Sequence, residues 1–282
     1  MWRQLSGKWI VICVALISFP VFAAINDSGV KIPWSYKGNT GPTFWGKLSP
    51  SYALCTQGRE QSPIDIRKNA LQLPNTLELH YQTAETSVID DGDTRLTIKD
   101  NVTIFNDGHT IQVNFEKSKV PNFVMYQGER YDLVQFHFHS PSESQLNGQS
   151  APLEVHFVHQ GSHGKALVIA VLIKGGASNA YLQELMKHLP HVASTQQAVV
   201  IDQHEMVNPQ DLFPLDNDYY SFPGSLTTPP CTEGLQWVVM AATSTATPAE
   251  IASIRTVIGG SNARAVQPLN KRVVAYSMEK AL

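Results

Sequence analysis

Short apolar segments recur along most of the chain, separated by residues typical of turns. The segments are rich in Val, Ile, Phe and Thr, the composition of β-strands. Sequences such as Asn106-Asp107-Gly108 and Asn147-Gly148 lie between them, and these residue types tolerate the backbone angles of turns. The predicted strands cover residues 77–83, 95–99, 102–105, 110–115, 131–139, 153–159 and 167–174.

Two segments instead have helical signals. Residues 178–189 form one candidate, and residues 248–258 form the other. The second has Thr247 as N-cap, Glu250 to complete a capping box and Gly259 as a stop. Neither helix carries candidate chemistry, so we expect both at the periphery of a mainly β domain.

The N-terminus resembles an export signal. A basic leader precedes an apolar run over residues 9–19, and a small-residue cleavage site ends at Ala23. A transmembrane anchor is the alternative, but the run is short for a bilayer span of about 20 residues and meets Pro20. We therefore predict a signal peptide over 1–23 and, without repeats or linkers, one domain over 24–282.

Composition and charge restrict the partners. Of 282 residues, 43% are hydrophobic, which supports a sizeable core and argues against disorder. With 21 basic and 24 acidic residues, the chain is mildly acidic, so we expect no nucleic-acid partner and no membrane attachment after signal cleavage. A homodimer is compatible with the sequence.

Cysteine usage fits an exported protein, periplasmic or secreted. Cys13 lies in the predicted signal peptide, so the mature chain retains Cys55 and Cys231. Disulfides persist in oxidising compartments, and we predict that these two residues are joined. Two buried free thiols are the alternative, because sequence alone does not establish proximity.

Three histidines form a candidate metal site. His137 and His139 are two residues apart on a predicted strand, so both imidazoles point to one face. The strand containing His156 can lie antiparallel beside the first and bring a third imidazole alongside. Three neutral nitrogen ligands and an open fourth position are what a catalytic Zn²⁺ requires.

Together with several longer motifs, this histidine pattern resembles the α-carbonic anhydrase family, in particular its exported bacterial branch. The strings QSPIDI and SLTTPPCTEG are specific together, and the match spans nearly the whole mature chain. The matching segments are residues 34–36, 41–46, 61–66, 106–109, the two His strands, and 225–234 with Trp237. The resemblance implies one domain built on a large, twisted, mostly antiparallel sheet.

The resemblance also implies a reaction, the reversible hydration of carbon dioxide to bicarbonate and a proton by zinc-hydroxide attack. It assigns His137, His139 and His156 as zinc ligands. It assigns Thr227 as the acceptor of the hydroxide's hydrogen bond and Glu143 as the partner of Thr227. An ionised Glu143 only accepts hydrogen bonds, so the Thr227 hydroxyl must donate its hydrogen to it.

Further roles follow from the same resemblance. Gln135 and Glu154 are expected to accept hydrogen bonds from ligand imidazoles. His109 matches a proton shuttle, and Tyr36 matches a hydroxyl that orders water. The expected substrate pocket comprises Thr227, Thr228, Val158, Val168, Leu226, Leu235 and Trp237.

Two departures and two rival interpretations remain. Asp107 stands where Asn is common in the family, and Ser144 stands where His is common. A cupin-type enzyme could use Glu143 as a fourth ligand and would favour iron or manganese, but it leaves both specific strings unexplained. A non-enzymatic binding domain of the same fold is the second rival, although all three ligands are present.

Overall fold

The computed structural model describes residues 32–67, 70–82, 86–90, 95–99, 102–115, 122–189, 199–201 and 208–278. The predicted signal peptide, residues 1–23, lies outside them. In the described part of the chain, no helix has the length and apolar character needed to cross a membrane.

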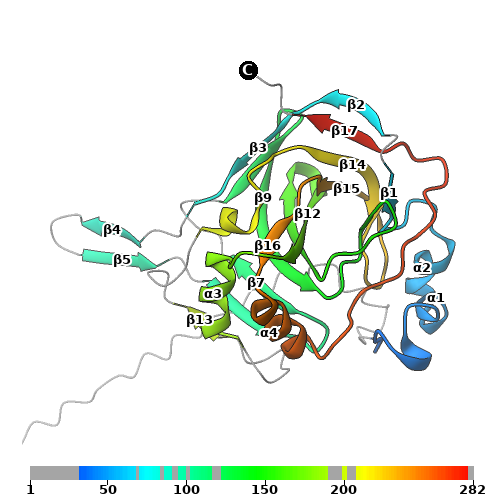
Figure 1. Cartoon of the computed structure of the whole chain (residues 1–282), viewed down its shortest axis with the longest axis horizontal. Helices are drawn as coiled ribbons and strands as arrows, with labels where there is room; N and C mark the ends of the chain where they lie inside the picture. Colours follow the sequence, from blue (N-terminus) through cyan, green and yellow to red (C-terminus); the bar gives the residue numbers. More distant parts are fainter. Residues whose placement is uncertain are drawn as a thin grey trace, which may run out of the picture.

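Strands dominate these residues (Figure 1). The helices are α1 (Trp45–Leu48), α2 (Leu54–Gln57), α3 (Ala180–Lys187) and α4 (Pro248–Ile258). The first strands are β1 (Asp65–Ile66), β2 (Leu71–Pro74), β3 (Leu77–His80), β4 (Thr86–Asp90), β5 (Arg95–Lys99), β6 (Val102–Asn106), β7 (Ile111–Phe115), β8 (Phe123–Tyr126) and β9 (Glu129–His139). The others are β10 (Gln145–Leu146), β11 (Leu153–Gly161), β12 (Ala166–Gly175), β13 (Val199–Ile201), β14 (Tyr219–Ser225), β15 (Glu233–Met240), β16 (Ser244–Ala246) and β17 (Ala275–Met278).

A 13-stranded sheet forms the body, in the order β13-β6-β7-β9-β11-β12-β15-β14-β17-β2 with β3, β8 and β16 beside this path. Most neighbours are antiparallel. The pairs β12 with β15, β12 with β16, and β17 with β2 are parallel. The predicted large, mostly antiparallel sheet with few helices is confirmed.

The central strands are buried on both faces. In β12 every residue from Leu167 to Ile173 is buried, so its sequence is a continuous apolar run without alternation. One face of the sheet packs into the main core, where Phe136 and Phe138 of β9 lie. The other face carries a second apolar cluster that includes Val168 and Trp237. The functional site lies on this second face.

Both predicted helices are present, and one of them is shorter than predicted. In α4, Thr247 and Glu250 form the predicted capping box, and Gly259 ends the helix at φ 83°. The predicted helix over 178–189 is shorter: α3 begins after Asn179, whose side chain caps it by accepting from Leu182 N, and ends at Lys187. Both helices bury apolar side chains in the main core and lie side by side at one edge of it (Figure 1).

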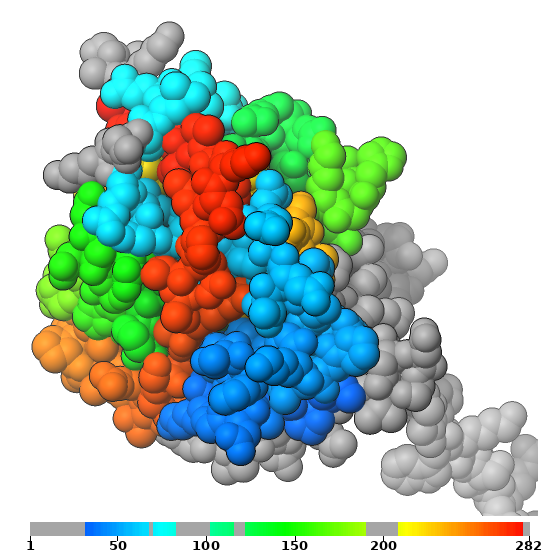
Figure 2. Space-filling model, turned by 90° about the vertical axis from the view of Figure 1, so that its right-hand side faces the viewer, coloured from blue at the N-terminus to red at the C-terminus, as the bar shows by residue number. Residues whose placement is uncertain are grey.

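The N-terminal and C-terminal parts of the described chain lie against each other (Figure 2). A disulfide joins Cys55 of α2 to Cys231, 176 residues later, which agrees with the predicted pairing. The buried Arg264 side chain adds two hydrogen bonds, from Nη2 to Cys55 O at 2.9 Å and from Nη1 to Ser62 O at 2.8 Å. Segments that are far apart in sequence are thereby held around one end of the sheet.

Candidate metal centre

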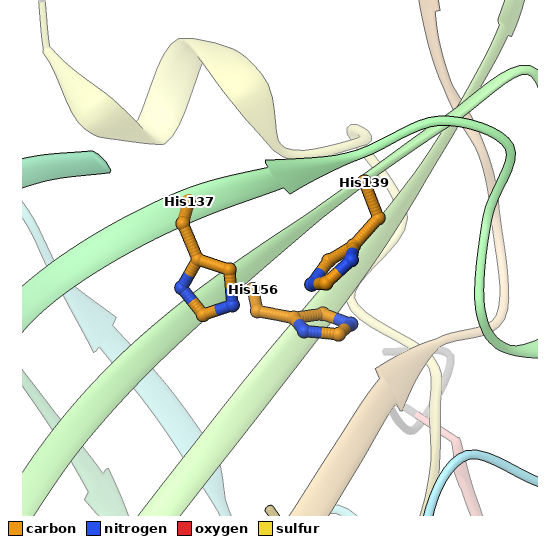
Figure 3. A group of neighbouring side chains, drawn as sticks. All are labelled: His137, His139 and His156. Atoms are coloured by element: carbon orange, nitrogen blue, oxygen red, sulfur yellow. The ribbon is translucent and has the colours of Figure 1, made fainter. Parts of the chain in front are cut away.

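Strands β9 and β11 bring three imidazoles together. The two strands are antiparallel neighbours, with His137 opposite His156 and His139 opposite Glu154. One ligand nitrogen from each of the three histidines lies within 4.8 Å of the others. The rings converge from the two strands in Figure 3. This is the juxtaposition that the sequence predicted.

Polar contacts on the far side of each ring determine which nitrogen faces the centre. His137 Nδ1 lies 2.9 Å from Gln135 Oε1, which leaves His137 Nε2 for a metal. His139 Nδ1 lies 2.9 Å from the main-chain oxygen of Asn262, which leaves His139 Nε2. Since these oxygens only accept, both Nδ1 atoms carry the hydrogen. Asn262 has no sequence signal for this role, because any residue offers a carbonyl.

The third ring is oriented by a buried carboxylate. His156 Nε2 lies 3.1 Å from Glu154 Oε1, which leaves His156 Nδ1 toward the other two ligands. Glu154 Oε2 accepts from the backbone N–H groups of Glu143 at 2.6 Å and Ser144 at 2.8 Å. Burial would raise the pKa of Glu154, but His156 and the hydrogen bonds from Ser144 outweigh it and hold the pKa at about 2. The Ser144 departure preserves this main-chain contact.

The donor set fits a Zn²⁺ ion. Burial lowers the pKa of His137 and of His139, so both rings are neutral and present lone pairs. His139 Nε2 is buried and has no hydrogen-bond partner among the described residues. An orphaned buried nitrogen is costly unless something binds it. Three neutral imidazoles are the ligands that zinc takes in catalytic sites with an open position.

Glu143 lies beside the ligands without completing their set. Its Oε2 is 3.5 Å from His139 Nε2 and 4.0 Å from His156 Nδ1, and its Oε1 accepts from Arg264 N at 2.8 Å. The Thr227 side chain also hydrogen-bonds to it. Burial raises the pKa of Glu143 to about 7 in the absence of a metal. The ligand-forming cluster in the described residues contains the three histidines and not Glu143, which disfavours the cupin-type arrangement.

A cavity opens over the imidazoles and is lined by both apolar and polar residues. Its polar wall includes Tyr36, Asp107 and His109, and Thr227 and Thr228 also line the cavity. The residues of the apolar wall are Val158, Val168, Leu226, Pro229 and Trp237. Leu235 does not line the cavity; it packs in the apolar cluster behind the wall.

His109 stands against an aromatic group on the polar wall. Its ring stacks on Trp34, with centroids 3.9 Å apart and planes at 10°. The Tyr36 ring lies farther away, at 6.3 Å. Asp107 Oδ1 accepts from the backbone N–H groups of His109 and Thr110, each at 2.8 Å. Asp107 therefore shapes the turn that carries His109, a contact that the side-chain oxygen of an Asn could also make.

Comparison with known proteins identifies the family. The sequence profile described as eukaryotic-type carbonic anhydrase matches residues 40–278. The chain belongs to the α-carbonic anhydrase family. It is 36% identical over 272 residues to a carbonic anhydrase of Pectobacterium carotovorum, covering 96% of this chain and 100% of that protein.

Solved carbonic anhydrases share the fold. An α-carbonic anhydrase of Photobacterium profundum is 39% identical with a TM-score of 0.72, covering 86% of this chain and 100% of that one. The α-carbonic anhydrase of Thermovibrio ammonificans, solved with the inhibitor sulfanilamide, is 35% identical with a TM-score of 0.75, covering 86% and 99%. Carbonic anhydrases hydrate carbon dioxide reversibly, so membership gives the reaction and its small substrates.

Proposed function

We propose that this α-carbonic anhydrase is a zinc enzyme whose metal is held by His137 Nε2, His139 Nε2 and His156 Nδ1. The observation that carries the proposal is the orientation of three buried rings by Gln135, the Asn262 carbonyl and Glu154. When bound, Zn²⁺ supplies a coordinated water acidified to a pKa of about 7, as the nucleophile for carbon dioxide.

Thr227 and Glu143 orient the group that reacts. The Thr227 hydroxyl bonds to Glu143, which is held in turn by Arg264 N. An ionised Glu143 has no hydrogen to give, so Thr227 donates to it. The Thr227 oxygen then accepts from an O–H group in the cavity. A nearby divalent cation favours the ionised form of Glu143 and so opposes the effect of burial on its pKa.

The apolar wall serves carbon dioxide, which has no net charge or dipole and gains little from polar groups. Val158, Val168, Leu226 and Trp237 line the cavity there. Thr228, which also lines the cavity, is the polar contact for bicarbonate. Leu235 supports the wall from behind rather than forming its surface.

His109 exports the proton that each hydration produces. Loss of a proton directly to water from a group of pKa about 7 is too slow for turnovers on the order of 10⁶ s⁻¹, a rate for which carbonic anhydrase is the standard example. A cavity imidazole titrating in the neutral range can carry the proton to buffer. Tyr36, on the same wall, orders the intervening water.

Export of the protein from the cytoplasm, with cleavage after Ala23, is part of the proposal. The disulfide between Cys55 and Cys231 supports it, because such bonds persist in oxidising compartments. The mature enzyme then acts in the periplasm or outside the cell.

Two variants test the proposal. His139→Ala removes a ligand, and we expect both zinc content and hydration to fall sharply. His109→Ala should lower kcat by roughly 10-fold to 100-fold and leave kcat/KM nearly unchanged, with imidazole buffer restoring turnover. Undiminished hydration by metal-free His139→Ala protein would overturn the zinc mechanism. A binding domain without activity, the remaining rival, predicts zinc binding with no hydration at all.

A further inference from the structure

Asn262 contacts one proposed metal ligand, His139, and also the turn that carries the proposed proton shuttle. It lies in the segment after α4 and is 2% exposed. Its main-chain oxygen holds His139 Nδ1 at 2.9 Å. Its side chain makes a separate set of bonds, to main-chain groups of Ser140, Phe138 and His109. Resting on the proposed function, we propose that the Asn262 side chain is a positioning residue for His109 and so for proton export.

The side-chain amide of Asn262 accepts one hydrogen bond and donates two. Asn262 Oδ1 accepts from Ser140 N at 2.8 Å, just beyond the end of β9. Nδ2 donates to Phe138 O at 2.9 Å and to His109 O at 3.0 Å. One planar, buried group therefore joins the ligand-bearing strand to the main chain of the shuttle residue.

The shuttle turn is the tip of the hairpin between β6 and β7, whose ladder ends at Asn106 opposite Ile111, so His109 itself makes no strand pairing with β9. Pairing between β7 and β9 begins at Gln112, opposite His137. Two residues before Gln112, Thr110 Oγ1 donates to Phe138 O at 2.6 Å and accepts from Phe138 N at 3.2 Å. The Asn262 bond then reaches one residue farther, to His109 itself.

The consequence is a fixed distance between the shuttle and the metal ligands. The Phe138 carbonyl accepts from both Thr110 and Asn262, and Phe138 lies between His137 and His139 in the chain. Stacking on Trp34 orients the imidazole ring of His109, while Asn262 holds its backbone. Proton transfer through water depends steeply on such positioning.

Truncating the side chain separates this role from support of the metal. In Asn262→Ala the carbonyl of residue 262 remains, so the acceptor for His139 Nδ1 is kept. The bonds to His109, Phe138 and Ser140 are lost. We expect one zinc per chain and a kcat/KM within about twofold of wild type. We expect kcat to be lower by about 3-fold to 10-fold, which is part of the roughly 100-fold that a proton-transfer group contributes.

A double-mutant cycle provides the decisive readout. If Asn262 acts through His109, adding Asn262→Ala to His109→Ala should not lower kcat further, and imidazole buffer should restore both single variants. If the variant does not fold, Asn262→Ser, which keeps one short donor, is measured in its place. Asn179→Ala is the matched control. Its buried amide bonds to Asp211 O and Leu182 N at the start of α3, so its loss should reduce stability without changing the ratio of kcat to kcat/KM.

The outcomes distinguish this inference from the proposed function. Wild-type protein that does not hydrate carbon dioxide would refute the proposed function, and an unaffected kcat in His109→Ala would refute the shuttle. If the proposed function and the shuttle both hold, either of two results would show that Asn262 supports only the metal site or the fold. The first is a fall of kcat/KM and zinc content in Asn262→Ala. The second is that Asn262→Ala lowers kcat as much in the His109→Ala background as in wild type.

Discussion

A buried histidine outside the metal site should make the protein sensitive to acid. His159 is 0% exposed and lies on β11, directly after a shift of register at Val158. Its Nε2 is 2.7 Å from the hydroxyl of Tyr81, which is also buried. Burial lowers the pKa of His159 to about 4. The core therefore holds this ring in its neutral form.

The direction of the pH effect follows from the difference in the pKa of His159 between the folded and the unfolded chain. The pKa is lower in the folded chain than the value of about 6.5 expected in the unfolded chain, so unfolding takes up a proton between these values. The stabilisation is complete above about pH 6.5 and is lost as the pH falls toward the folded pKa. At about 1.4 kcal/mol per pKa unit, the full loss is about 3.5 kcal/mol.

Urea unfolding of metal-free wild type and His159→Gln measures this loss without a contribution from zinc. Between about pH 7.5 and about pH 4.5, the unfolding free energy of wild type should fall by about 2.5 kcal/mol more than that of the variant. Protonation of the three metal-site histidines changes the unfolding free energy of both proteins equally. His163→Gln, at an exposed position, is the matched control and should follow wild type. Parallel pH profiles for wild type and His159→Gln would refute the reasoning.

Three further predictions concern the surroundings of the site and the core. Glu154→Gln should weaken zinc binding by about 10-fold to 100-fold in a chelator competition, because the carboxylate that orients His156 is lost; an unchanged affinity would contradict this role of Glu154. Tyr181→Phe should raise the unfolding free energy by about 1 kcal/mol, since the Tyr181 hydroxyl is buried without a partner among the described residues; a loss of stability would show a partner. Reducing the disulfide between Cys55 and Cys231 should lower the unfolding free energy by up to about 5 kcal/mol, because it closes a loop of 176 residues; alkylation of two thiols in unreduced, denatured protein would contradict the bond.

The strands nearest the chemistry were predictable from local composition. The predicted strand over 153–159 lies within β11, and the strand over 167–174 lies within β12. Because alternate residues of a strand point to the same face, His137 and His139 were expected on one face of the sheet. Strands β14 and β15 were outside the predicted set. Pro223 and Gly224 interrupt the pattern of β14, and its formation depends on pairing with β15, the next strand in the chain, and with the more distant β17.

The candidate site was predictable only in part, because some of its contacts come from main-chain groups. Side-chain chemistry identified the three histidines, whereas main-chain groups leave no trace in the sequence. The carbonyl of Asn262 and the amide of Arg264 reach His139 and Glu143 from more than a hundred residues away in the chain. The stacking of Trp34 on His109 likewise depends on how the N-terminal segment folds back across the cavity.

The central claim is that hydration of carbon dioxide depends on zinc held by the three histidines. The most direct test measures stopped-flow hydration on one preparation as purified, after removal of metal by a chelator, and after titration with Zn²⁺. We predict that activity disappears with the metal and returns in proportion to added zinc, reaching a plateau at one ion per chain. Hydration that persists in metal-free protein, or zinc-replete protein no faster than buffer, would contradict the account.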